Sequence, residues 1–255
     1  MREDRFRIIQ VTDCHLQKEP TDLFKGVNPE ARLLQVLNHI QAHVEPYDLL
    51  LLTGDLVHHG YPEGYQRLYS YIKDLGDKRG WLPGNHDDAA EMQQFALLSD
   101  KEFTLGCWSV LSLDSTSNPD GVGSGSIGSE ELQWLHGRLE QLKGQHVIIA
   151  LHHPPLEVGS LWQDAIKLGN ADVFLDLVSK YPAVKLMLCG HLHQEHALTC
   201  GHISLLATPA TAPQFQPATE TPLLETLSPQ SLPGYRVIDL YSEGEFDSFV
   251  QRVSI

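Results

Sequence analysis

Five short apolar runs in this chain each lead directly into a motif that contains Asp, Asn or His. Continuous apolar runs of this kind are typical of β-strands that are buried on both faces. In open α/β sheets the carboxyl ends of the strands form the ligand-binding edge, so polar side chains that follow such strands are expected to lie together. The runs and their motifs are residues 7–12 before Asp13-Cys14-His15, 48–53 before Gly54-Asp55, 79–82 before Pro83-Gly84-Asn85-His86-Asp87, 146–151 before His152-His153-Pro154, and 184–189 before Gly190-His191-Leu192-His193.

Helical patterns lie between these apolar runs. Asn28 before Pro29 combines a good N-cap with proline at the first helical position, and the apolar residues that follow are spaced as on one helix face. A second helical face spans residues 68–75. Further helices are expected near Ser129 and Asn170, each of which can act as an N-cap. Strands that alternate with helices predict a layered α/β domain.

The length of 255 residues fits a single α/β domain, and we predict one domain over residues 1–255. No internal repeat or low-complexity tract divides the chain. Residues 207–234 contain six prolines and no clear period, which predicts an extended surface segment. Residues 235–241 follow as the expected last strand.

The composition argues against some classes of binding partner. A formal charge of −15 argues against nucleic acid, whose phosphate backbone requires a basic face, but a small phosphate ester can still bind where metal ions supply positive charge. No apolar run approaches the roughly 18–20 residues that cross a bilayer, so no membrane partner is expected. The charged start at residues 1–5 lacks the apolar core of a signal peptide, which favours the cytoplasm and free thiols on the four cysteines. The oligomeric state is left open.

The residue types in the five motifs suit metal binding. Asp13 and His15 are two positions apart, so in extended backbone they would point the same way and could share one metal. The carboxylate of Asp55 can bridge two cations, and Asn85 offers a neutral oxygen. Imidazole nitrogens come from His152, His191 and His193. Mixed ligation of this kind, without cysteine, suits manganese, iron or zinc ions rather than a structural zinc.

Each motif alone has a plainer interpretation, because an Asp or His after a strand is more often a turn, a cap or a packed side chain. The five motifs in this order, each at a strand end, favour a common site. Other histidines are ambiguous or are set aside: His153 is expected to support a ligand or lie at the surface, and the pair His58 and His59 to line the pocket or be solvated. His39 and His43 are spaced like a zinc pair, but no third ligand accompanies them and a solvated helix face is favoured.

The motifs together resemble those of the calcineurin-like metallophosphoesterases, over nearly the whole chain. They are most similar to the class III cyclic nucleotide phosphodiesterases, which include bacterial 3′,5′-cyclic AMP phosphodiesterases. The resemblance implies a four-layer αββα sandwich, in which two packed mixed β-sheets are flanked by helices. Further cues for it are Gly26-Val27-Asn28, Leu113-Asp114-Ser115, Leu206-Ala207-Thr208-Pro209 with Gln214-Phe215, and Pro233-Gly234-Tyr235-Arg236.

The resemblance also implies roles for individual residues. One metal would be held by Asp13, His15, Asp55 and His193, and the other by Asp55, Asn85, His152 and His191. Asp55 would be the bridge. His86 would be a catalytic histidine that binds no metal, oriented by Asp87. The residues expected to contact the substrate are His15, Asp55, Asn85, His86 and His193.

The activity implied by the resemblance is hydrolysis of 3′,5′-cyclic AMP to 5′-AMP. It would use two divalent cations, Fe²⁺ and/or Mn²⁺, and a hydroxide that bridges them. The main alternative is another small phosphoester, such as a different cyclic nucleotide, a glycerophosphodiester or a nucleotide ester, since the metal motifs are shared among these and fold alone does not choose. A binding scaffold without catalysis is disfavoured by the complete ligand set together with His86 and Asp87.

Overall fold

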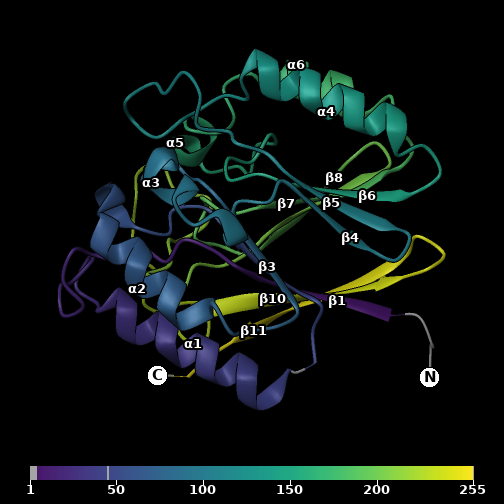
Figure 1. Cartoon of the computed structure of the whole chain (residues 1–255). Helices are drawn as coiled ribbons and strands as arrows, with labels where there is room; N and C mark the ends of the chain where they lie inside the picture. Colours follow the sequence, from purple (N-terminus) through teal and green to yellow (C-terminus); the bar gives the residue numbers. More distant parts are fainter. Residues whose placement is uncertain (1–4, 45, 255) are drawn as a thin grey trace.

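The computed structural model describes residues 5–44 and 46–254. Two β-sheets pack face to face and helices cover the outer face of each, which gives four layers (Figure 1). The predicted αββα sandwich is therefore confirmed. Residues 1–4, which carry most of the charged start, lie outside the described part of the chain.

The first sheet has the strand order β11-β10-β1-β2-β3. Strands β1, β2 and β3 are parallel to one another, and β10 and β11 continue the sheet in antiparallel pairing beyond β1. The first and the second-last strands in sequence are therefore neighbours. Their bounds are β1 Arg5–Val11, β2 Leu49–Thr53, β3 Lys78–Leu82, β10 Gly234–Tyr241 and β11 Phe246–Arg252.

The second sheet has the order β4-β5-β6-β7-β9-β8. Strands β5, β6, β7 and β9 are parallel, and an antiparallel strand closes each edge. Their bounds are β4 Glu102–Leu105, β5 Trp108–Ser112, β6 His146–Ala150, β7 Val184–Cys189, β8 His196–Cys200 and β9 Ile203–Ala207.

Helices α1 and α2 cover the first sheet, and α4 and α6 cover the second (Figure 1). Asn28 caps α1 as predicted, by accepting a hydrogen bond from the Ala31 amide at 2.7 Å. Gly128, and not Ser129 as predicted, occupies the N-cap of α4. Asn170 occupies the predicted N-cap of α6, but its side chain bonds the backbone of Ile127 and makes no cap hydrogen bond. The helix bounds are α1 Pro29–His43, α2 Pro62–Ile72, α3 Ala89–Gln93, α4 Ser129–Gln141, α5 Leu161–Asp164 and α6 Ala171–Val178, with single 3₁₀ turns at His58–Gly60 and Ala96–Leu98.

Alternating side chains of each central strand enter different core layers, which explains why the strands are apolar throughout. In β2, Leu50 and Leu52 pack under α1 and α2, whereas Leu49 and Leu51 pack between the two sheets. The layer between the sheets also contains Trp108, which is fully buried. A strand that is covered on both faces by other elements has no solvated side to carry polar residues.

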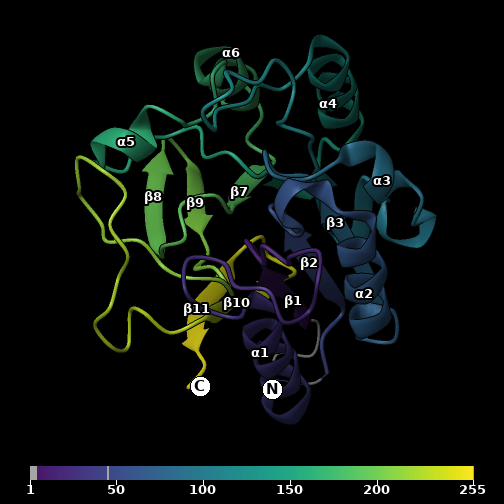
Figure 2. The same ribbon diagram turned by 90° about the vertical axis from the view of Figure 1, so that its left-hand side faces the viewer.

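One prediction about the Pro-rich segment is wrong. Its first part, residues 207–215, is buried throughout, and only the part from about residue 216 to 232 is largely exposed. The buried part follows β9 at the same end of the sandwich as the metal-ligand motifs, where the loop after β1 lies beside it (Figure 2). Thr211 and Ala212 donate backbone hydrogen bonds to the carbonyls of Thr12 and Asp13.

No helix within residues 5–44 and 46–254 is both long enough and apolar enough to span a membrane.

Candidate metal centre

The loops after β1, β2, β3, β6 and β7 meet at one end of the sandwich, where the carboxyl ends of the parallel strands of both sheets lie together. All seven predicted metal ligands lie in these loops. Six of them are almost fully buried, with exposed fractions between 0 and 7%, and Asn85 is half-buried. The buried six are Asp13, His15, Asp55, His152, His191 and His193.

The loops after β1 and β2 run side by side in a fixed register. The amide of Asp13 bonds the carbonyl of Gly54, and that of His15 bonds the carbonyl of Asp55. Asp13, His15 and Asp55 have φ values of 52°, 47° and 51°. The expectation of extended backbone from Asp13 to His15 is therefore wrong, and the two side chains converge because of a left-handed turn instead of strand alternation.

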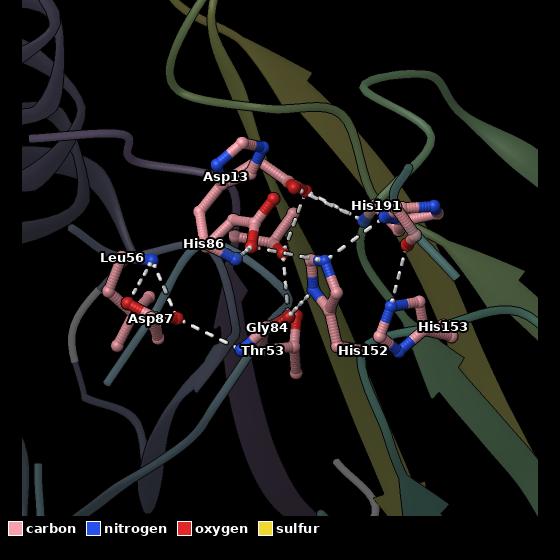
Figure 3. A network of polar contacts seen from close by, with 12 residues as sticks. Asp13, Thr53, Leu56, Gly84, His86, Asp87, His152, His153 and His191 are labelled. Carbon is pink, nitrogen blue, oxygen red and sulfur yellow. Dashed lines mark hydrogen bonds and ion pairs between the residues drawn. The ribbon is translucent and has the colours of Figure 1, made fainter. Parts of the chain in front are cut away.

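Asp55 lies between two groups of ligand side chains. Its Oδ2 is 3.6 Å from His15 Nε2, and its Oδ1 is 3.4 Å from His152 Nε2. On the His15 side, His193 Nε2 lies 3.0 Å from His15 Nε2 and 3.5 Å from Asp13 Oδ1. On the other side, His191 Nδ1 lies 3.2 Å from His152 Nε2 (Figure 3). One carboxylate thus presents an oxygen to each group.

Backbone carbonyls determine which imidazole nitrogen faces inward. His152 Nδ1 donates to Thr53 O at 2.9 Å, His193 Nδ1 to Pro213 O at 2.6 Å and His191 Nε2 to Ile166 O at 3.1 Å. Because a carbonyl only accepts, these nitrogens carry the hydrogen and the inward nitrogens of neutral rings carry lone pairs. Lone pairs that face each other across about 3 Å repel unless a positive charge lies between them.

The buried carboxylates attract positive charge to this centre. Burial opposes ionisation of His152, yet Asp55 and Asp13 raise the pKa of His152 to about 9. Burial raises the pKa of Asp13 to about 8, and the like charge of Asp55 contributes to this. Burial similarly opposes ionisation of Asp55, but His152 and His15 hold the pKa of Asp55 well below its usual range.

The Asn85 side chain supplies a further sign that a cation fits here. Its Oδ1 is buried and has no hydrogen-bond partner among residues 5–44 and 46–254. An amide oxygen left without a partner costs about 1–3 kcal/mol, unless a ligand satisfies it. Oxygen and imidazole ligands of this mixture fit one or more divalent cations, and groups such as Asp13, His15 and His193 bring their ligand atoms within 4.8 Å of one another.

The model of the calcineurin-like phosphoesterase family matches residues 6–195 of the sequence. The chain belongs to this family. A 3′,5′-cyclic-nucleotide phosphodiesterase of Nostoc sp. is 36% identical, over 96% of this phosphoesterase and 92% of the relative. The 3′,5′-cyclic adenosine monophosphate phosphodiesterase CpdA of Escherichia coli is 35% identical, over 99% and 91%. Among solved structures, a dimetal phosphatase from Danio rerio has a TM-score of 0.65 at 14% identity, over 98% of this chain and 99% of that one, which shows the shared fold.

The phosphoesterase does not use Asp87 in the way its sequence suggests. The carboxylate of Asp87 accepts hydrogen bonds from the amides of Leu56 and Gly84 (Figure 3). It also accepts from the Val57 amide and the Tyr65 hydroxyl, and it accepts none from His86. The predicted orientation of His86 by Asp87 therefore does not involve a hydrogen bond between the two side chains. Asp87 instead ties the loop that carries His86 to the loop after β2.

The structure defines the positions of two histidines for which the sequence left two alternatives. His153 is fully buried, with Nδ1 2.8 Å from Ser115 Oγ and Nε2 3.1 Å from Gly123 O, so it holds the loop that follows β5. His58 lines the site, since its Nδ1 lies 3.2 Å from His15 Nδ1 and its ring centroid 4.4 Å from that of His86. Burial and the neighbouring His86 lower the pKa of His58 to about 4.

Several supporting residues of the phosphoesterase were not predicted. Phe24 stacks on the His15 ring at 4.4 Å, and Phe215 lies 4.9 Å from the His193 ring. Thr12 donates a hydrogen bond to Asp13. The apolar run at residues 203–207 ends at this edge like the five predicted strands, and that pattern could have placed the segment with Phe215 beside the site.

Proposed function

We propose that this phosphoesterase hydrolyses 3′,5′-cyclic AMP to 5′-AMP with two divalent cations, Fe²⁺ and/or Mn²⁺. The observation that carries the proposal is the convergence of buried carboxylates and inward-facing imidazole nitrogens on both sides of Asp55. The substrate rests on two relatives that match nearly the full chain and whose names state cyclic nucleotide phosphodiester hydrolysis.

The two cations would be held in two groups that share Asp55. Asp13, His15 and His193 complete the first group, and Asn85, His152 and His191 complete the second. One oxygen of Asp55 faces each group, Oδ2 toward His15 and Oδ1 toward His152. When bound, the cations would neutralise charge on the phosphate and lower the pKa of the attacking water.

The residues of the chain itself supply orientation and a proton. His86 binds no metal in this assignment and donates a proton to the leaving O3′ of the ribose, a contribution typically worth about 10²–10⁴-fold in rate. Its backbone amide donates to Asp55 Oδ1 at 2.9 Å, which fixes its place next to the proposed bridge. Asp87 is assigned a positioning role through the loop contacts described above. His15, Asp55, Asn85, His86 and His193 would surround the bound phosphate.

A substrate panel tests the proposal. We expect metal-loaded enzyme to hydrolyse 3′,5′-cyclic AMP with only a modest preference over 3′,5′-cyclic GMP, because one compact phosphate can reach the cations in either nucleotide. The measurement is kcat/KM for both, alongside a 2′,3′-cyclic nucleotide and bis(p-nitrophenyl) phosphate. Turnover of the synthetic diester without any turnover of 3′,5′-cyclic AMP would refute the substrate and leave the broader phosphodiesterase assignment.

A further inference from the structure

His15 differs from the other histidines of the centre in the group that contacts its outward nitrogen. The outward nitrogens of His152, His191 and His193 all donate to backbone carbonyls. The outward Nδ1 of His15 instead lies 3.2 Å from Nδ1 of another side chain, His58. The contact that orients the His15 ring is therefore made by a side chain, which a substitution can remove.

The backbone places His58 opposite His15. The loops after β1 and β2 are joined by a ladder in which His15 N bonds Asp55 O, Leu16 N bonds Leu56 O and His58 N bonds Leu16 O, at 2.9 to 3.0 Å. A turn follows at once, since His59 and Gly60 have φ values of 61° and 63°. The half-buried His58 ring is thereby directed toward the centre, while its neighbour His59 is exposed.

The chemistry of a neutral imidazole determines what this contact can do. If Nε2 of His15 is to offer its lone pair to a cation, Nδ1 must carry the hydrogen and requires an acceptor. His58 Nδ1 is the acceptor within reach, and it accepts when its own hydrogen is on Nε2. Phe24 stacks on the His15 ring with an interplanar angle of 12°, so the face and the outward edge of the ring are both held.

We propose that His58 is a positioning residue of the metal centre: its Nδ1 accepts the hydrogen of His15 Nδ1 and thereby fixes the tautomer and orientation in which His15 binds a cation. The inference rests on the proposed function, because it assumes that His15 is a ligand. It assigns His58 to the group formed by Asp13, His15, Asp55 and His193, and not to the group around His152 and His191. Outer partners of metal-binding histidines are typically worth about 10–100-fold in metal affinity.

Two substitutions separate hydrogen bonding from packing. His58→Leu removes the acceptor but keeps an apolar side chain against Phe24, whose ring centroid is 4.8 Å from that of His58. His58→Asn places an amide oxygen at the position of Nδ1 and so keeps an acceptor with less ring surface. His59→Asn is the matched control, because His59 is exposed and Asn tolerates its positive φ.

The experiment titrates each metal-free, folded protein with Mn²⁺ and follows the free ion by electron paramagnetic resonance, with thermal unfolding as a check of the fold. We expect His58→Leu to weaken one of two Mn²⁺ sites by about 10–100-fold and leave the other unchanged. His58→Asn and His59→Asn should bind both ions nearly as tightly as the wild type.

Other outcomes are equally informative. Unchanged binding by His58→Leu overturns the positioning role, and so does a loss in His58→Asn as large as that in His58→Leu, because the ring and not the acceptor would then matter. If the wild-type protein itself binds no divalent cation, the proposed function fails. If it binds two ions and His58→Leu does so equally well, only the present inference fails.

Discussion

At the scale of single residues, the centre depends on backbone conformations that side chains rarely adopt. Asp13, His15, Asp55, His191 and His193 all have φ between 47° and 72°. Asp and His tolerate the left-handed region better than most residues, but such positions still cost about 1–3 kcal/mol each and cluster at functional sites. Gly54, with a φ of 89°, leaves no room for a Cβ, which would collide with the His152 ring. Five of the seven proposed ligands thus reach inward from strained turns.

The first prediction concerns Asp55. Because it is proposed to contribute an oxygen to each cation, Asp55→Ala should lose metal occupancy and phosphodiesterase activity together. Elemental analysis of the purified variant, beside steady-state rates, measures both. Asp239→Ala is a suitable control, since Asp239 pairs with Arg7 near the amino-terminal end of β1, away from the centre. A variant of Asp55 that keeps two bound metals would contradict the bridging assignment.

The second prediction separates His86 from the ligands. His86→Ala should keep both metals and lower kcat for cyclic AMP by about 10²–10⁴-fold, because only proton donation is removed. The loss should be smaller for bis(p-nitrophenyl) phosphate, whose leaving group needs little proton donation. Equal losses on both substrates would count against the general-acid role, and an empty metal site would show that His86 is a ligand.

At the scale of elements, a buried polar chain joins the two sheets beneath the site. The Gln10 side chain on β1 donates to Thr53 Oγ1 and to the carbonyl of Cys189, which ends β7. Thr208, just after β9, donates to Gln10 Oε1 and accepts from Arg236 of β10 at 3.1 Å. At the end of the sandwich that carries the metal centre, these hydrogen bonds therefore border the apolar layer between the sheets. These bonds hold the loops after β1, β7 and β9 in one arrangement.

The third prediction tests this chain of hydrogen bonds. Gln10 is fully buried, so Gln10→Leu should leave its partners unsatisfied and lower the free energy of unfolding by about 1–3 kcal/mol. Urea unfolding in the presence of a chelator measures the change without a contribution from bound metal. Gln41→Leu, at an exposed position of α1, should change stability by less than about 0.5 kcal/mol. Equal stability of Gln10→Leu and wild type would mean that the network is not what couples the sheets.

At the scale of the whole molecule, the net negative charge of the chain and the buried carboxylates of the site both attract cations. The chain carries a formal charge of −15, and its buried carboxylates Asp13 and Asp55 lie close to each other. Cations that bind there remove repulsion in the folded state only, because the ligands come from loops that are far apart in the unfolded chain. Metal binding should therefore stabilise the fold as well as permit catalysis.

The fourth prediction is a dependence of thermal stability on metal. Mn²⁺ at about 100 times its dissociation constant should add about 2.7 kcal/mol per site, and a chelator should remove this gain. The midpoint of thermal unfolding, measured with Mn²⁺ and with chelator, checks it. Asp55→Ala should show a much smaller difference between the two conditions. An identical midpoint for the wild type in both would argue against cation binding by the native state.

The amino-acid sequence alone predicted the layered α/β class, the five strands that precede the motifs and the identity of the candidate ligands. These features are local: a strand covered on both faces must be apolar along its length, and metal binding requires particular side-chain types. The resemblance to the calcineurin-like family, read from the same motifs, supplied the two-sheet arrangement. Asn28 before Pro29 is equally local, and it correctly marked the start of α1.

The way in which the loops around those motifs fit together could be seen only in the folded chain. The burial of residues 207–215, the contacts of Asp87 and the contact between His58 and His15 all join segments from different parts of the chain. No local sequence pattern predicts these contacts, because an Asp or His has the same local preferences whether its partner is water or a distant backbone amide. The partner is set by the packing of the two sheets, which brings the carboxyl ends of their strands to one place.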